Sequence, residues 1–183
     1  MSIRALAEEH GGKRTNKFNQ SKGLSQNWRH LIPESQGGVC GGLSLMWLSS
    51  RKSGLTQNVF EKRYAEPLFK YAERASQLGA NNCLGGHQGI DNVANTLGLN
   101  KGSAKVTVSN TGMPKWIVKG PSKYVFIAVN GHAVAAEISG KVVNFFDPNY
   151  GQFKFPDTLK FVLFMQDYLT ITNQTAAFLK FYR

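Results

Sequence analysis

The amino-acid sequence predicts an α+β domain in which helices come first and an antiparallel sheet follows. Up to Gly98, apolar residues recur at spacings of three and four, which is typical of helices packed on a core. After Lys105, short segments rich in Val, Ile and Phe are separated by turn signals such as Asn130-Gly131. The chain has 183 residues, of which 42% are hydrophobic, so it can bury the core of one such domain.

Three helices are predicted in the first part of the chain. The first begins at Cys40, buries a stripe of large apolar side chains and ends at Gly54. The second is capped by Thr56 and bends or breaks at Pro67, and a short third helix covers residues 90–97.

The second part is predicted to form strands at residues 105–109, 124–129, 132–138, 141–146, 152–155 and 178–182. One helix interrupts them, capped by Asp157 and running to Tyr168. Because two-residue turns join the central strands, we expect these strands to pair in antiparallel hairpins.

Residues 1–30 are polar and basic and are predicted to form a flexible arm, in which His10 and His30 have no assigned role. The domain is therefore expected to span residues 31–183. The arm contains no apolar segment typical of a secretory leader, and no stretch of the chain is apolar over a length that crosses a bilayer. These features predict a soluble protein that leaves its cell, if at all, by a leaderless route.

The formal net charge is +11, and it is unevenly distributed. No acidic residue occurs between Asp91 and Glu137, where five lysines stand at positions 101, 105, 115, 119 and 123. One interpretation is a face that attracts acidic proteins or anionic membranes, and the other is a solvated surface. No nucleic-acid-binding motif is present, so a specific nucleic-acid partner is not expected.

Three residues predict a catalytic site: Cys40, His132 and Asp147. If Ser139-Gly140 is a two-residue turn, His132 lies directly opposite Asp147 on neighbouring strands, within reach of an Nδ1–H to carboxylate hydrogen bond. A thiol, an imidazole and a carboxylate together form a nucleophile, its base and the group that orients the base. Taken singly, each has a structural explanation: a buried cysteine, a core histidine and an Asx turn.

Cys40 is predicted to begin a helix within a glycine-rich segment. The positive end of the helix dipole favours a thiolate there, and the glycines leave room for a substrate backbone. We expect the backbone N–H of Cys40 to contribute to an oxyanion hole, completed by the side chain of Gln36 or, failing that, by Ser35.

A metal site is not expected. Cys83 and His87 stand four residues apart with Asp91 nearby, but no second pair of ligands accompanies them. No cofactor is predicted either, and a disulfide between Cys40 and Cys83 is disfavoured, because an isolated cysteine in this context is more often a free thiol.

The segments GGVCGGLSLMW and GHAVAAEISGKVVNFFDPNYGQFKF resemble the YopT/AvrPphB family of bacterial effector cysteine proteases, a likeness that covers residues 36–50 and 124–165. The resemblance implies a papain-like fold with Cys40 as nucleophile, His132 as base and Asp147 as orienting group. Gln36 departs from the family's pattern, because it stands closer to the nucleophile than the oxyanion-hole side chain usually does.

The resemblance also implies proteolysis of a host protein as a virulence effector, after type III secretion into the host cytosol. Branches of the family act on membrane-associated small GTPases or on a kinase, and we expect this chain to work as a monomer. Residues 1–30 suit an uncleaved secretion signal. Two alternatives stay open: an acyltransferase or deamidase of transglutaminase type with the same triad, and a basic binding module without catalysis.

Overall fold

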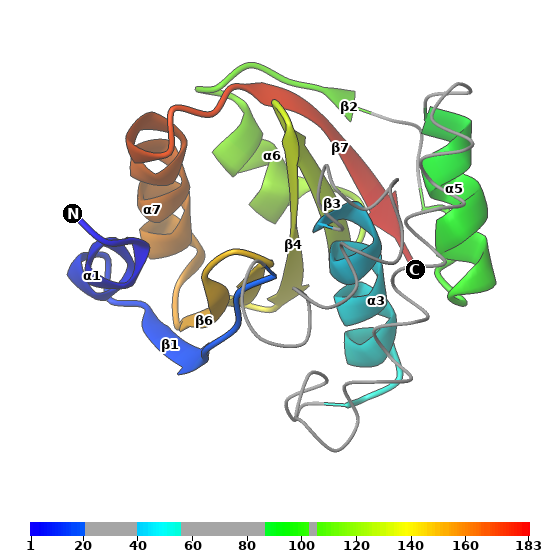
Figure 1. The fold of residues 1–183 in the computed structure, drawn as a ribbon, viewed down its shortest axis with the longest axis horizontal. Coiled ribbons are helices and arrows are strands. Elements are labelled where there is room, and N and C mark those ends of the chain that lie inside the picture. The colour runs from blue at the N-terminus through cyan, green and yellow to red at the C-terminus, as the bar shows by residue number, and fades with distance from the viewer. Residues whose placement is uncertain (21–39, 56–86, 103–105) are drawn as a thin grey trace.

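Seven antiparallel strands form one sheet, in the order β1-β6-β5-β4-β3-β7-β2, in the computed structural model of the chain (Figure 1). The structure describes residues 1–20, 40–55, 87–102 and 106–183. The strands are β1 Lys13–Asn16, β2 Val106–Thr107, β3 Tyr124–Val129, β4 His132–Ser139, β5 Val142–Asp147, β6 Gly151–Phe155 and β7 Ala176–Tyr182.

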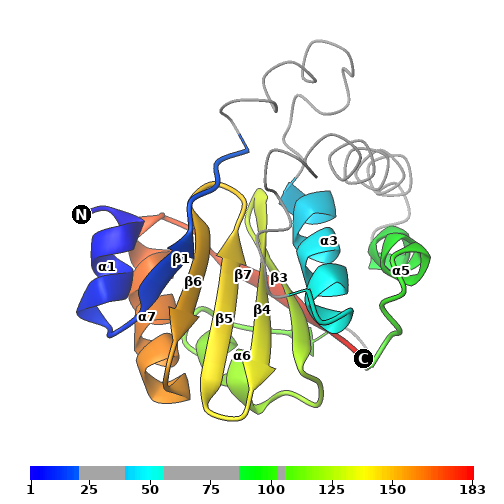
Figure 2. The same ribbon diagram turned by 90° about the horizontal axis from the view of Figure 1, so that it is seen from below.

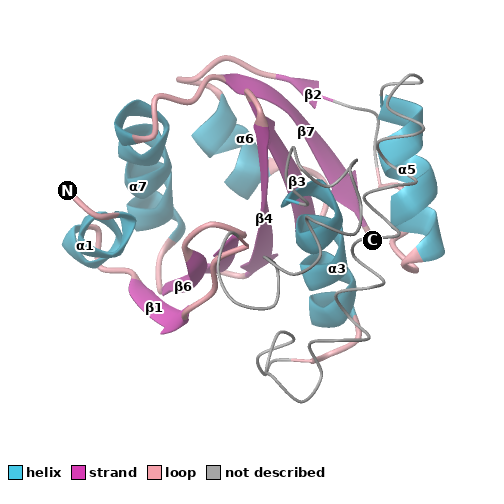
Figure 3. Cartoon of the chain, viewed as in Figure 1, coloured by secondary structure: helices cyan, strands magenta, loops and turns pink. Residues whose placement is uncertain are grey.

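The described helices cover both faces of this sheet (Figure 3). They are α1 Ile3–Glu9, α3 Cys40–Lys52, α5 His87–Thr96, α6 Met113–Lys119 and α7 Thr158–Ile171. Helices α1, α6 and α7 pack on one face, and α3 and α5 pack on the other (Figures 1 and 2). None of these helices has the length and hydropathy that a membrane crossing requires.

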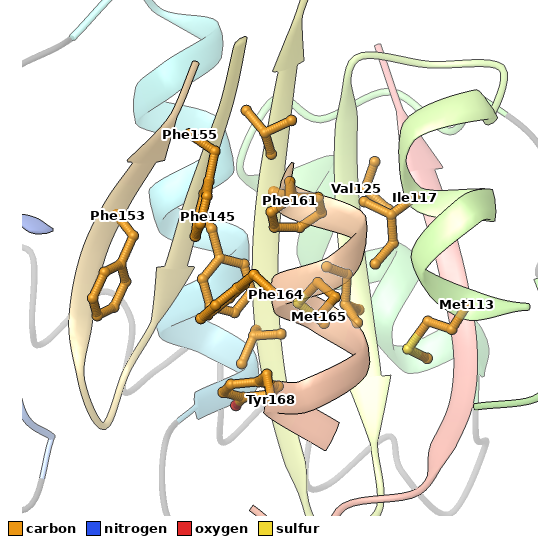
Figure 4. Packing of buried hydrophobic residues seen from close by; sticks show 14 of the residues in the cluster. Met113, Ile117, Val125, Phe145, Phe153, Phe155, Phe161, Phe164, Met165 and Tyr168 are labelled. Atoms are coloured by element: carbon orange, nitrogen blue, oxygen red, sulfur yellow. The ribbon is translucent and has the colours of Figure 1, made fainter. Parts of the chain in front are cut away.

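The first core lies between α7 and the central strands and is built from aromatic rings (Figure 4). Phe145 on β5 is surrounded by Phe161, Phe164 and Tyr168, whose ring centroids lie 5.6–5.8 Å from its own. The spacing of three and four residues along α7 directs these three side chains to the sheet. Their burial fixes α7 against β5, and thereby positions the end of β5.

The second core lies on the opposite face, under α3. Trp47 of α3 is buried and stacks on Phe146 of β5 at a centroid distance of 5.6 Å. The apolar stripe predicted for the helix that begins at Cys40 is therefore confirmed. Gly98 follows α5 with a φ of +74°, a conformation that favours glycine and ends the helix as predicted.

The β4–β5 turn differs by one position from the prediction. Ser139 pairs with Val142, so the turn is Gly140-Lys141 and not Ser139-Gly140. Gly140 has a φ of +60°, which glycine adopts without strain, and this explains where the chain reverses. The register is therefore shifted by two residues, and each side chain keeps its predicted face of the sheet.

The prediction of a flexible arm over residues 1–30 is wrong for its first part. Ile3, Leu6 and Ala7 of α1 are buried in the first core, and Ser2 caps the helix by accepting a hydrogen bond from the Ala5 N–H. β1 then adds a strand to the edge of the sheet beside β6. Residues 21–30, and with them the proposed boundary at residue 31, lie outside the described residues.

The strands predicted at residues 124–129, 132–138, 141–146 and 152–155 are confirmed within one residue at each end. The helix that Asp157 caps is also confirmed, but it continues beyond the predicted end at Tyr168 to Ile171. Helix α6 was not predicted, because it is only seven residues long and contains Pro114. The helix predicted from Thr56 lies outside the described residues.

Candidate functional site

His132 and Asp147 meet at one end of the sheet. His132 is the first residue of β4 and Asp147 the last residue of β5, so the hairpin brings both to the same edge. Their side chains are joined by a hydrogen bond of 2.9 Å between Nε2 and Oδ1. The nitrogen is Nε2 and not the predicted Nδ1. Because the register is shifted by two, the pair is diagonal across the strands rather than directly opposed.

The carboxylate of Asp147 is fully buried and has partners on both oxygens. Oδ1 also accepts a hydrogen bond of 2.8 Å from the Asn149 N–H, which closes the turn after β5. Oδ2 accepts one of 2.6 Å from the hydroxyl of Tyr168, on α7. Burying a charged group away from water costs free energy unless the group is hydrogen-bonded. These contacts therefore stabilise the buried carboxylate of Asp147.

Tyr168 is the residue of this site that the sequence interpretation missed. The sequence pattern predicts a helix at this position but no role for the side chain. The available signal was a tyrosine at the end of a stripe that is otherwise phenylalanine, Phe161 and Phe164, because a buried tyrosine hydroxyl needs a polar partner.

Cys40 begins α3, and this helix starts at the end of the sheet where β4 starts and β5 ends (Figure 2). It is a free cysteine, half-buried, and its side chain hydrogen-bonds to His132. Since Nε2 of His132 faces Asp147, Nδ1 is the ring nitrogen left for the thiol. The three residues that the sequence singled out therefore lie in one cluster.

The imidazole of His132 is held in its charged form. Burial disfavours the cation, but the hydrogen bonds and negative charges of Asp147 and Cys40 outweigh that effect and raise the pKa of His132 to about 10. At neutral pH the site therefore holds an imidazolium between a carboxylate and the sulfur. This is the charge arrangement in which a cysteine acts as a nucleophile and a histidine donates a proton.

Helix α3 is fixed to the sheet by polar contacts at three levels. Near its start, the Ser44 hydroxyl donates to the Ala133 carbonyl at 3.1 Å, next to His132 in the chain. One turn later, Trp47 Nε1 donates to Gln152 Oε1 at 3.1 Å. These contacts set the height of Cys40 above the sheet.

At the last turn of α3, Arg51 forms an ion pair with Glu137 of β4 at 2.5 Å. The Glu137 side chain is 5% exposed and also contacts Lys123 and Asn144, at 3.0 and 3.1 Å. The ionised groups at this buried position are thus paired, which limits the cost of their desolvation.

Three other residues that the sequence analysis considered for a site, namely Gln36, Ser35 and Cys83, lie outside the described residues. Asp91 binds Lys101 and Lys180 at 3.1 and 2.7 Å, and within the described ranges no three His, Cys, Asp or Glu residues are grouped as metal ligands.

Two of the five lysines between positions 101 and 123 form ion pairs within the domain. Lys101 and Lys123 are engaged with Asp91 and Glu137, whereas Lys115 and Lys119 are exposed on α6. Ion pairs within the fold therefore use two of these cations, and Lys105 lies outside the described residues.

A protein-family model, Peptidase_C58, described as Yersinia/Haemophilus virulence surface antigen, matches residues 4–77 and 69–176 of the chain. The matched residues include the cluster of cysteine, histidine and aspartate and most of the sheet. They also include α1 and β1, which agrees with their place in the folded domain.

Among curated proteins, the chain is similar to the protein adenylyltransferase and cysteine protease IbpA of Histophilus somni, with 25% identity over 195 residues. The alignment covers 87% of this chain but only 5% of IbpA, so the chain corresponds to a small part of that protein.

Two solved structures share the fold. The Pseudomonas avirulence protein AvrPphB superposes with a TM-score of 0.62 at 17% identity, covering 82% of this chain and 94% of AvrPphB. PatoxP, a cysteine protease-like domain of the Photorhabdus asymbiotica toxin PaTox, superposes with a TM-score of 0.58 at 12% identity. That alignment covers 97% of this chain and 57% of PatoxP.

Proposed function

The chain belongs to the Peptidase_C58 family of cysteine proteases, and from this membership we propose that it hydrolyses a peptide bond with Cys40 as nucleophile, His132 as acid and base, and Asp147 as orienting group. The observation that carries the assignment is the contact of His132 with both other residues, through a 2.9 Å bond to Asp147 and a hydrogen bond to Cys40. Its geometry matches the roles that this chemistry requires.

In the proposed mechanism, the sulfur of Cys40 attacks the carbonyl carbon of the scissile bond and forms a tetrahedral intermediate. The imidazolium of His132 gives its proton to the amide nitrogen, the C–N bond breaks, and the new amine leaves. His132 then takes a proton from water, which attacks the thioester and releases the acid and the sulfur. Asp147 keeps Nε2 engaged throughout, so the proton is exchanged at Nδ1.

The negative oxygen of the intermediate needs hydrogen-bond donors. We assign one of them to the backbone N–H of Cys40, since the first N–H groups of a helix have no acceptor within the helix. The second donor is proposed to be Gln36, with Ser35 as the alternative.

The substrate is proposed to be a host-cell protein, with the chain acting as a virulence effector delivered by type III secretion. Membrane-associated small GTPases and kinases are the candidate substrates that the family suggests. These assignments concern the biological setting and do not alter the chemistry assigned to Cys40.

The test is N-terminal profiling of a host-cell lysate treated with wild-type protein or with Cys40→Ala. We expect new N-termini with the wild type and none with Cys40→Ala, His132→Ala or Asp147→Ala, while circular dichroism shows each variant folded. Cys83→Ser is the matched control, because it removes the chain's other cysteine and is expected to keep full activity.

Other outcomes would assign a different function. A mass increase of about one unit on a glutamine of a lysate protein, without a new terminus, would identify a deamidase working through the same thioester. New N-termini produced by folded Cys40→Ala would overturn the assignment of Cys40 as nucleophile. Finding neither new N-termini nor deamidation with the wild type would leave a basic binding module without catalysis.

A further inference from the structure

A cavity of about 480 Å³ opens beside the candidate active site, between the N-terminal segment, the β5–β6 turn and the last turn of α7. Its volume lies in the range of ligand pockets, about 300–1,000 Å³. It exists because α1 and β1 fold onto the domain, which brings residues 14–18 next to residues 149–150.

The described residues that line the cavity include three cations, Arg4, Arg14 and Lys17, and no aspartate or glutamate. Arg4 is engaged with Glu8 of α1 at 2.8 Å. Within the described part of the chain, Arg14 and Lys17 have no such ion pair. Two positive charges in a recess focus the field on whatever enters it, so the cavity favours an anionic group.

The remaining lining is largely apolar. It includes the rings of Phe18 and Tyr150 and the side chain of Ile171. Tyr150 and Ile171 are 39% and 41% exposed, although both are large and hydrophobic. Apolar surface next to unpaired cations suits a ligand that carries both an apolar group and a carboxylate.

The cavity adjoins the cluster of His132 and Asp147 through two residues of the turn that follows β5. Asn149 lines it and donates its backbone N–H to Asp147 at 2.8 Å. Tyr150 lines it too, and burial together with the nearby charge of Asp147 raises the pKa of its hydroxyl. A polypeptide bound across the candidate active site would therefore reach this cavity.

We propose that this cavity is a substrate subsite that binds an acidic segment of the target polypeptide, with a carboxylate at Arg14 and Lys17 and an apolar side chain against Phe18, Tyr150 and Ile171. The proposal rests on the proposed proteolytic function. A polypeptide is preferred over other anions because the cavity adjoins a site assigned to peptide bonds and has an apolar half.

The test is selection of displayed random 12-residue peptides on immobilised Cys40→Ala protein, which binds without cutting. We expect enrichment of Asp or Glu next to a large apolar residue. The same selection on Cys40→Ala combined with Arg14→Glu and Lys17→Glu is expected to enrich Lys or Arg instead, because the charge of the cavity is reversed.

Two further variants separate the charge effect from folding. Lys17 is exposed, so Lys17→Glu alone is expected to keep the fold and to weaken a synthetic selected peptide about tenfold. Lys141→Glu makes the same charge change in the exposed β4–β5 turn, at the opposite end of β5, and is expected to leave the affinity unchanged.

The subsite proposal would be overturned if the variant with Arg14→Glu and Lys17→Glu enriched the same peptides as Cys40→Ala alone. The absence of acidic enrichment would also overturn it, as would Lys17-dependent binding to phosphatidylserine vesicles but not to acidic peptides. Because the selection measures binding alone, it is distinct from the cleavage test. Acidic binding without cleavage by the wild type would refute the proteolytic function, whereas cleavage without acidic preference would refute the subsite.

Discussion

At the scale of single residues, the buried carboxylate of Asp147 organises the site. It is hydrogen-bonded by a histidine on β4, by a backbone N–H of its own turn, and by Tyr168 on α7. Since Tyr168 is 1% exposed, it does not touch a substrate and acts through Asp147. We therefore regard it as a positioning residue.

Tyr168→Phe is expected to lower kcat about tenfold with little change in KM, because the imidazole is held less well while the binding surface is intact. Losing a hydrogen bond to a buried carboxylate also costs about 1–3 kcal/mol of stability. Alkylation of Cys40 in a Cys83→Ser background gives a second readout that is independent of substrate. The rate of alkylation is expected to fall in parallel with kcat.

Tyr182→Phe is the matched control. Tyr182 is equally buried and donates its hydroxyl to Asp91 at 3.2 Å, on the other face of the sheet. We expect a comparable loss of stability with unchanged kcat and alkylation rate. Equal kinetic effects of the two substitutions would mean that Tyr168 supports only the fold.

Asp147→Asn is expected to shift the titration of His132 to lower pH. The carboxylate hydrogen bond and charge are among the causes that raise the pKa of His132 to about 10, and an asparagine keeps the shape but not the charge. Removing an opposite charge at this distance lowers a histidine pKa by about 1–3 units. NMR of the His132 ring, assigned with His132→Gln, measures this shift; an unchanged midpoint would contradict the electrostatic role of Asp147.

At the scale of elements, the N-terminal segment supports the turn that follows Asp147. The Gln20 N–H donates to the Pro148 carbonyl at 2.7 Å, and its side-chain amide donates to Asn149 Oδ1 at 2.8 Å. Gly151, at the start of β6, has a φ of +104° and leaves no room for a Cβ beside the backbone of Asn16. The edge strand and the site are thus packed together.

Gly151→Ala is expected to destabilise the protein by about 2 kcal/mol or more and to reduce cleavage, because the new methyl group forces Asn16 away from the turn. Gly140→Ala is the matched control at the opposite end of β5. Its φ is also positive, at +60°, but nothing lies within 4 Å of the added Cβ. We expect a smaller loss of stability and normal activity. Urea unfolding and kcat/KM measure both, and normal activity in Gly151→Ala would show that the support is dispensable.

The sequence predicts elements well where they carry a regular pattern. β3, β4 and β5 combine apolar runs with glycine-containing turns, and their pairing follows from those turns. The exact register of the strands does not follow from the sequence, because Ser139-Gly140 and Gly140-Lys141 are both acceptable two-residue turns. The juxtaposition of His132 and Asp147 survives because an error of two residues preserves the face.

Elements with little pattern were not predictable in the same way. α1 has seven residues and β1 is KRTN, a strand with no apolar side chain, so neither signals burial by its own composition. Their place depends on partners far along the chain, namely α7 and β6. The hydroxyl of Tyr168 is a similar case, because only the tertiary structure brings it to Asp147.

At the scale of the whole molecule, the two helical layers hold the sheet from both faces, and the fold shared with AvrPphB agrees with the predicted papain-like architecture. Among the described residues, each layer contains a buried tyrosine–aspartate pair: Tyr168 with Asp147 in the first, and Tyr182 with Asp91 in the second. The stability of the protein therefore depends on pH through titratable groups that are buried on both faces of the sheet.

The stability of the protein is expected to fall as the pH rises above about 10. Burial and the neighbouring aspartates raise the pKa of both Tyr168 and Tyr182 above the ordinary value of 10.0. A group with a raised pKa contributes stability that is complete below its unfolded pKa and is lost as the pH rises toward its folded pKa. Each tyrosine thus lowers the free energy of unfolding by about 1.4 kcal/mol per pH unit in that range.

Urea unfolding at pH 8 and from about pH 10 to about 11.5 measures this slope, because between pH 6.5 and about 10 the raised pKa of His132 also lowers the free energy of unfolding. Tyr182→Phe is expected to be less stable at pH 8 but to lose stability less steeply with pH, because it has no phenol to titrate at that position. Parallel alkaline slopes in wild type and Tyr182→Phe would show that Tyr182 titrates as it does in the unfolded chain.

At low pH the stability is expected to fall as the pH decreases, because Asp91 is then protonated. Burial opposes the charge of Asp91, but Lys180 and Lys101 outweigh this effect and lower its pKa below 3.8. The stability that the charged Asp91 contributes is therefore lost only as the pH falls below that value.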